Sequence, residues 1–189
     1  MTATTPSIKN LRQRLKRSEW LTTCYHEASH AVAALHLDQH FDCIAVHPYN
    51  NTRGGMVAYE ADDPKVDAII SLLGCVFEHW LSPSIPVDSG EEDEDWNSDW
   101  NNALSCGWRL GLVDDERSGG GNQMDDAVRQ RLLPEAEQLF QEHFDDIVTL
   151  GEALRKKGRG GRMSETECRA TVNRKAAAIL LPSTVLGNN

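Results

Sequence analysis

Apolar residues recur at three- and four-residue steps along most of the chain, which is the spacing that buries one face of a helix. The first such stretch begins at Ser18, a capping residue, and continues to about Leu37. The second begins at Asp63-Pro64, where a capping side chain precedes a proline suited to the first helical position, and continues to Leu81. The pattern therefore predicts two long amphipathic helices in the first half of the chain.

Helical spacing returns in the second half of the chain over three stretches, at about residues 98–111, 125–154 and 164–181. Pro134 is expected to split or kink the middle stretch, because proline removes a backbone donor and clashes with the preceding turn. The last stretch opens on Ser164-Glu165-Thr166-Glu167, which matches the S-x-x-E capping box. These features predict three or four further helices.

Two short runs rich in β-branched and aromatic residues, 41–47 and 56–59, lie between the first two helices. A polar loop with proline, asparagine and glycine separates them, so they predict a β-hairpin or two neighbouring strands. The predicted fold class is α+β: mainly α, with a small β-hairpin or sheet.

A chain of 189 residues suits one domain with a hydrophobic core and is short for two. We expect residues 1–17 to form a basic N-terminal arm, residues 18–182 a single domain, and residues 183–189 a C-terminal tail. The basic residues of the arm are expected to lie on a solvated surface.

The net charge of −10 argues against binding to nucleic acid, which requires a basic face, and against docking on anionic membranes. No run of 18 apolar residues and no apolar leader segment occurs. The five cysteines are scattered and never spaced as C-x-x-C, which is typical of reduced thiols. We therefore expect a cytoplasmic protein.

The candidate catalytic residues of the sequence lie in one motif, His26-Glu27-Ala28-Ser29-His30. Residues four apart on a helix return to the same face, so the two imidazoles can reach one ion. Glu27 lies about 100° round the helix from His26, where a carboxylate can take a proton from a water without binding the metal itself. This is the H-E-x-x-H arrangement, with two zinc ligands and a general base. We expect one Zn²⁺ per chain.

The third ligand is not fixed by this motif. His36 lies ten residues after His26, as the last histidine does in H-E-x-x-H-x-x-G-x-x-H proteins. However, Ala33 replaces the turn glycine of that motif. It favours a continued helix, which would direct His36 away from the other two histidines. The other candidates are later carboxylates. They are Glu78, Asp95 and Asp99.

Several segments resemble the peptidase domain of the FtsH-type zinc proteases. The segments are Tyr25-His26-Glu27-Ala28-Ser29-His30-Ala31-Val32, Ile44-Ala45-Val46-His47-Pro48, Gly54-Gly55-Met56-Val57, Leu73-Gly74-Cys75-Val76-Phe77-Glu78, Asp99-Trp100-Asn101-Asn102-Ala103-Leu104 and residues 135–154. The resemblance implies the helical zincin fold of that domain, with Asp99 as the third zinc ligand. Glu78 remains an alternative ligand, or a group that orients a histidine.

The resemblance also implies a reaction, the hydrolysis of peptide bonds by a water that Glu27 activates. Residues Met56, Val57, Ala58 and Tyr59 are expected to hold an extended substrate by strand pairing. The phosphate-binding loop of the family's ATPase does not occur in this sequence, so the expected substrates are short peptides or unfolded protein, hydrolysed without ATP. A homo-oligomer or a separate partner protein is a further expectation.

The sequence departs from the family pattern at two places: Ser29 stands where the family has glycine, and Trp96-Asn97-Ser98 replaces its T-G-A before the aspartate. These departures motivate an alternative, a zinc-binding regulatory or partner-binding module without proteolytic activity. A third hypothesis is a helical interaction domain that binds no metal.

Overall fold

Helices make up most of the structure, a computed structural model that describes residues 7–46, 55–59, 62–84, 98–113 and 121–180. The helices and strands are α1 (Ile8–Leu15), α2 (Glu19–His36), β1 (Phe41–Val46), β2 (Gly55–Tyr59), α3 (Pro64–Leu81), α4 (Ser98–Arg109), α5 (Gly121–Arg131), α6 (Leu133–Lys157), β3 (Arg162–Ser164) and α7 (Glu165–Leu180). The predicted class, mainly α with a small sheet, is confirmed.

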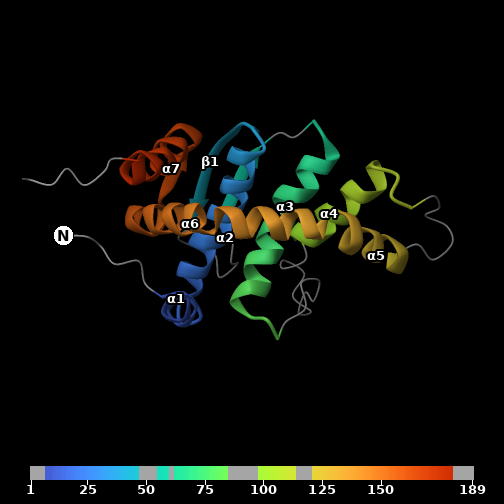
Figure 1. Cartoon of the computed structure of the whole chain (residues 1–189), viewed down its shortest axis with the longest axis horizontal. Coiled ribbons are helices and arrows are strands. Elements are labelled where there is room, and N and C mark those ends of the chain that lie inside the picture. The colour runs from blue at the N-terminus through green and yellow to red at the C-terminus, as the bar shows by residue number, and fades with distance from the viewer. Residues whose placement is uncertain (1–6, 47–54, 60–61, 85–97, 114–120, 181–189) are drawn as a thin grey trace, which may run out of the picture.

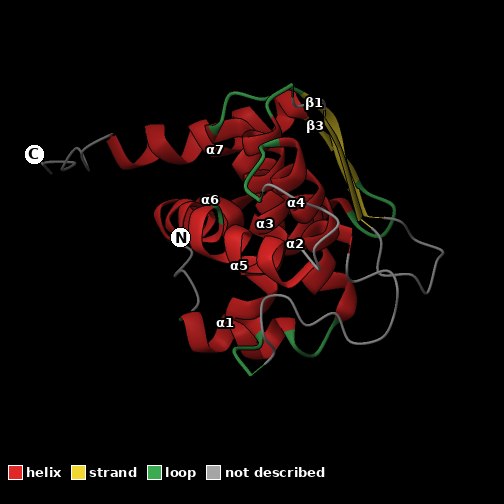
Figure 2. Ribbon diagram, turned by 90° about the vertical axis from the view of Figure 1, so that its right-hand side faces the viewer, coloured by secondary structure: helices red, strands yellow, loops and turns green. Residues whose placement is uncertain are grey.

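The long helix α6 lies across α2 and α3, which contact each other beneath it (Figure 1). Helix α4 packs on α3, and α5 contacts both α4 and α6. The sheet stands at one side of the helices and contacts α2 (Figure 2). The core lies where α2, α3 and α6 meet, and Ile70, Leu73, Ile147 and Leu150 are fully buried there. Helix α2 is thus supported by neighbours on several sides.

The helix boundaries follow the capping residues of the sequence. Ser18 accepts a hydrogen bond from the backbone N–H of Leu21, and Asp63 accepts one from Lys65 at 2.8 Å. The predicted capping box forms in both directions, because the N–H of Glu167 donates to Ser164 and the N–H of Ser164 donates to the Glu167 carboxylate at 3.0 Å. Capping side chains satisfy backbone donors that the first turn leaves free.

Pro134 lies in the first turn of α6 and separates this helix from α5, so the predicted split is confirmed. The two strands are also confirmed, with β1 and β2 antiparallel and Ile44 opposite Val57. A third strand, β3, pairs with the other edge of β1 and was not predicted. It has only three residues, too few to show an alternating pattern.

The boundary predicted between an arm at 1–17 and a domain from 18 is wrong for residues 8–15, which form α1. Leu11 and Leu15 are buried in the same core as α2 and α3. Arg14 donates hydrogen bonds to the Tyr25 hydroxyl on α2, at 2.7 Å, and to Glu152 on α6. Two leucines four residues apart form one helix face, and this short face was hidden among basic residues.

Among the helices of the described ranges, none combines the length and the apolar character needed to cross a membrane. The predicted tail at 183–189 lies outside the described residues.

Truncation of Leu15 should test whether α1 belongs to the core. The Leu15 side chain is fully buried, so Leu15→Ala should lower the free energy of unfolding by about 2–5 kcal/mol. Ile8 on the same helix is 56% exposed, and Ile8→Ala should change the free energy of unfolding by less than about 0.5 kcal/mol. Urea denaturation measures both values, and equal small effects would show that α1 contributes nothing to the core.

Candidate metal centre

Helix α2 presents His26 and His30 on one face, as their four-residue spacing predicts. Their Nε2 atoms lie 3.1 Å apart, and the two rings meet edge to face. The His26 side chain is 20% exposed and that of His30 is 9% exposed, so the pair lies at the rim of the core with access from solvent. The arrangement leaves both nitrogens directed to one point.

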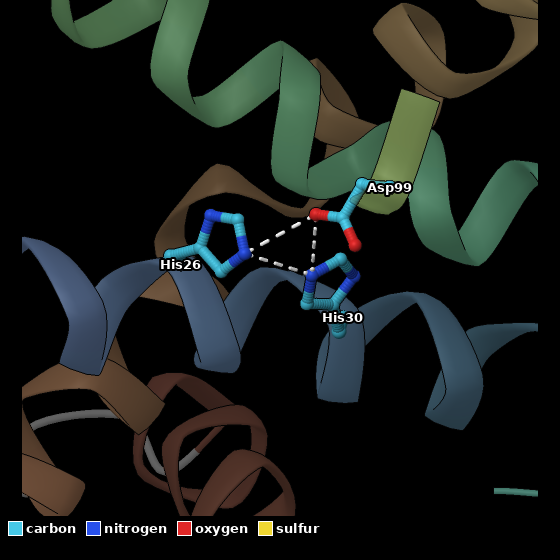
Figure 3. Close-up of side chains that lie close together, drawn as sticks. All are labelled: His26, His30 and Asp99. Atoms are coloured by element: carbon cyan, nitrogen blue, oxygen red, sulfur yellow. Dashed lines mark hydrogen bonds and ion pairs between the residues drawn. The ribbon is translucent and has the colours of Figure 1, made fainter. Parts of the chain in front are cut away.

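Asp99, in the first turn of α4, completes a triangle with the two histidines (Figure 3). Its Oδ2 atom lies 3.2 Å from His26 Nε2 and 3.1 Å from His30 Nε2. Ligands at zinc-bond length in a tetrahedral site lie about 3.3 Å from one another. The three atoms therefore have the spacing of one face of a tetrahedron, and their donor types suit Zn²⁺.

Acceptors behind each histidine orient the rings. His30 Nδ1 lies 2.8 Å from the carbonyl oxygen of Ile70, and His26 Nδ1 lies 3.0 Å from Glu78 Oε1. A proton held on Nδ1 by such an acceptor leaves the lone pair on Nε2, the atom that faces Asp99. Glu78 therefore faces Nδ1 of His26, whereas Asp99 faces Nε2, and an orienting role for Glu78 stays a prediction.

Gly74 on α3 makes the space in which these side chains meet. A Cβ atom at this position would lie 2.6 Å from His30 Cε1 and 2.7 Å from His30 Nε2, and would also overlap Asp99 Oδ2. Glycine in a helix interior costs about 1 kcal/mol relative to alanine. The close approach of α3 to both ligands explains why this position carries no side chain.

The charges of the centre belong to one coupled group. Burial opposes the charged form of both histidines, but Asp99 beside them and Glu78 beside His26 raise the pKa of His26 well above its ordinary value and also raise that of His30. Burial likewise opposes the Asp99 carboxylate, yet the charge of His30 and hydrogen bonds from both rings hold the pKa of Asp99 far below its usual range. The two rings and the carboxylate thus favour opposite charges and stabilise one another.

Glu27 follows His26 on α2 and is almost fully buried, with 4% of its surface exposed. Its Oε1 atom lies 4.0 Å from His26 Nε2, so it borders the triangle without joining it. Burial raises the pKa of Glu27 above that of an ordinary glutamate, against the attraction of the two histidines. A carboxylate with a raised pKa can accept a proton and release it again near neutral pH.

The other candidates fall elsewhere. His36 ends α2 and lies 3.3 Å from Asp146, away from the triangle. Asp95 lies outside the described residues. The backbone of Met56–Tyr59 lies in β2, an edge strand of the sheet that contacts α2, and the structure describes no side chain there.

Sequence reasoning missed one part of the centre and indicated another. The Ile70 carbonyl is a backbone group, and no residue type signals its role. Gly74 did carry a signal, since an isolated glycine within a helical pattern indicates close packing against another element. The departure at Ser29 is accommodated inside α2, where its hydroxyl donates to the carbonyl of His26 at 2.6 Å.

No known family model matches the chain, and no curated protein matches it either. The resemblance to FtsH-type peptidases therefore stays a prediction from the residues.

A methyl group at position 74 should obstruct the centre. Gly74→Ala should weaken zinc binding by about tenfold or more, because the new Cβ displaces His30 and Asp99. Gly107→Ala in α4 is the matched control, since its Cβ would meet the flexible end of Met124. Zinc titration with a competing chelator measures both, and equal affinities would contradict the proposed fit.

Zinc affinity should depend steeply on pH. The pKa values of His26 and His30 are raised, so each ring must lose a proton before Nε2 can bind the ion. Affinity should therefore rise from about pH 6 to about pH 8, by about tenfold per pH unit for each proton displaced. Calorimetry in buffers of different ionisation enthalpy counts these protons, and binding without proton release would show that the rings are already neutral.

Proposed function

We propose that the chain is a zinc-dependent peptidase that hydrolyses peptide bonds with Glu27 as the general base. The observation that supports this most strongly is the triangle of His26 Nε2, His30 Nε2 and Asp99 Oδ2, with sides of 3.1–3.2 Å and the Glu27 carboxylate beside it. Two of these residues and Glu27 form the H-E-x-x-H motif, and the third comes from a different helix.

Three protein ligands favour a catalytic rather than a structural ion. Structural zinc sites are closed by four protein ligands, whereas catalytic sites keep a position for water or substrate. Within the described ranges, no fourth histidine, cysteine or carboxylate joins the group of His26, His30 and Asp99. The partial exposure of His26 leaves the approach from solvent open.

The chemistry divides between ion and protein. A Zn²⁺ held by the three residues would polarise the substrate carbonyl and lower the pKa of a water bound to it. Glu27 accepts a proton from the attacking water and passes it to the nitrogen of the leaving amine as the C–N bond breaks. Glu78 and the Ile70 carbonyl hold the histidine rings in place, and Asp99 balances their charge.

The proposed substrates are short peptides and unfolded segments of proteins. An extended strand can pair with the exposed edge of a sheet through backbone hydrogen bonds, independently of its side chains. Strand β2 contacts α2 and lies at the edge of the described sheet, so a peptide paired with it would run beside the helix that carries Glu27. Delivery by a homo-oligomer or a partner protein is compatible with this arrangement.

We further propose a cytoplasmic setting. All five cysteines are free and buried, and burial raises the pKa of the Cys24 thiol to about 12, which keeps it protonated and unreactive. Thiols of this kind suit a reducing compartment.

Replacement of Glu27 by glutamine should separate binding from chemistry. Glu27→Gln keeps size and shape but cannot accept the proton, so hydrolysis of unfolded casein should fall by about a hundredfold or more while one zinc per chain is retained. Glu19→Gln, on the exposed start of the same helix, is the control and should leave hydrolysis unchanged. Hydrolysis that persists in Glu27→Gln would refute the proposal.

Zinc content without hydrolysis by the unmodified chain would instead support the alternative of a non-catalytic zinc-binding module. A chain that contains no zinc after purification and cannot be loaded with it would reject both functions.

A further inference from the structure

A groove lies at the surface between α1 and the C-terminal end of α3, which lie beside each other (Figure 1). Its volume is about 440 Å³, within the range of sites that hold a small molecule or a few residues of a peptide. The residues that line it include Ile8, Lys9, Arg12, Lys16, Leu81 and Pro83.

The rim of the groove is positively charged. Lys9, Arg12 and Lys16 lie on one face of α1, because positions three and four residues apart share a helix face. No acidic residue occurs among residues 7–17. Arg14, outside this face, pairs with Glu152, whereas within the described ranges no ion pair engages the three cations of the rim. This local positive charge contrasts with the net charge of −10 of the whole chain.

An aromatic ring, rather than a carboxylate, holds Arg12 in place. Its guanidinium carbon lies 4.6 Å from the centroid of the Trp80 ring on α3. A cation–π contact orients the guanidinium but leaves its positive charge without a counter-ion. The Arg12 Nε atom is buried and has no hydrogen-bond partner among the residues that the structure describes. The charge is therefore fixed at the rim before any ligand binds.

Apolar side chains accompany these cations. Ile8 is the one exposed large apolar side chain of the described ranges, at 56%. Leu81, which ends α3, is buried, and Pro83 beyond it is exposed. A single exposed apolar residue is common on protein surfaces, but this one shares a groove with two other apolar residues and three cations. The groove therefore offers apolar contact flanked by positive charge.

These properties select the chemistry of a ligand. Charge complementarity requires carboxylates, and the apolar part of the groove requires an apolar side chain beside them. Helix α1 has 8 residues and a length of about 12 Å, which about four residues of an extended peptide would cover. A concave surface of this size suits a peptide better than a flat membrane, and the net negative charge of the chain opposes binding to anionic membranes or nucleic acid.

We propose that this groove binds a short acidic segment of a partner polypeptide. Its carboxylates pair with the three cations of α1, and an apolar side chain of the segment packs against Ile8 and Leu81. The proposal is independent of metal binding and of the peptidase activity, since all the groups that carry it belong to the groove.

The groove lies close to the candidate metal centre. Leu81 follows Glu78 by three residues, which is about one turn of α3, and Glu78 Oε1 lies 3.0 Å from His26 Nδ1. A polypeptide held in the groove would therefore be kept near the histidines of α2.

Fluorescence anisotropy with the full chain tests the proposal. The probe is a fluorescein-labelled peptide of about eight residues in which glutamate and aspartate flank leucine, and its control has glutamine and asparagine in place of the acids. The double variant Lys9→Gln, Lys16→Gln should bind the probe about fivefold more weakly, as the loss of two exposed ion pairs predicts. The matched double variant Lys156→Gln, Arg159→Gln removes two exposed cations outside the groove and should bind it as the unmodified chain does.

The apolar contact and the charge contact have separate tests. Ile8→Ala should weaken binding of the probe by about threefold or more, because it removes apolar area from the groove. Raising the salt concentration from about 50 mM to about 500 mM should weaken binding to the unmodified chain and have little effect on the double variant without Lys9 and Lys16. Circular dichroism checks that each variant is folded.

Equal binding of the probe by the unmodified chain and the Lys9, Lys16 variant, or no binding by either, overturns the proposal. Three other results would assign the groove to a different occupant and also overturn it. Binding to phosphatidylserine vesicles without binding to the probe would assign it to a membrane, and a dimer that Ile8→Ala dissociates would assign it to a second copy of the chain. Binding of the probe only after residues 91–94 are replaced by glutamine would assign it to the acidic run of the chain itself.

Discussion

The close contact of α2 with α3 at Gly74 determines the rest of the candidate metal centre. Because position 74 has no side chain, the His30 ring can lie against the backbone of α3 and reach the Ile70 carbonyl one turn earlier. The same gap admits Asp99 from α4, which packs on α3. Three helices thus meet at this point. Helix α2 contributes the two histidines, α3 contributes the space and the carbonyl acceptor, and α4 contributes the carboxylate.

The charges of His26, His30 and Asp99 stabilise one another. Ligand atoms that converge without an ion must be stabilised by protons and hydrogen bonds, and Asp99 stabilises both protonated histidines in that state. The cost of burying these charges is offset by the pairing among them. Binding of an ion would exchange protons for metal with little movement of the helices, since the three atoms already have tetrahedral spacing.

The placement of His26 and His30 on one face of α2 could be predicted from the sequence, because a four-residue spacing on a capped amphipathic helix determines which side chains share a face. Asp99 was reached only through a family resemblance, since no local rule relates a residue of α4 to a residue of α2. The stacking of the His36 ring on the His143 ring had no signal, because it depends on the packing of α2 against α6. Strand β3 and helix α1 were missed because three residues and two leucines give too short a pattern.

The link from Arg14 to the Tyr25 hydroxyl and Glu152 has a practical consequence for anyone who shortens this chain. Tyr25 immediately precedes His26, and its hydroxyl is tethered to both α1 and α6. A protein trimmed to begin at Ser18, the boundary that composition suggests, would lose one of the two guanidinium groups that pair with Glu152 and the two buried leucines of α1. Recombinant fragments meant to retain the geometry of His26, His30 and Asp99 should therefore keep the N-terminal helix.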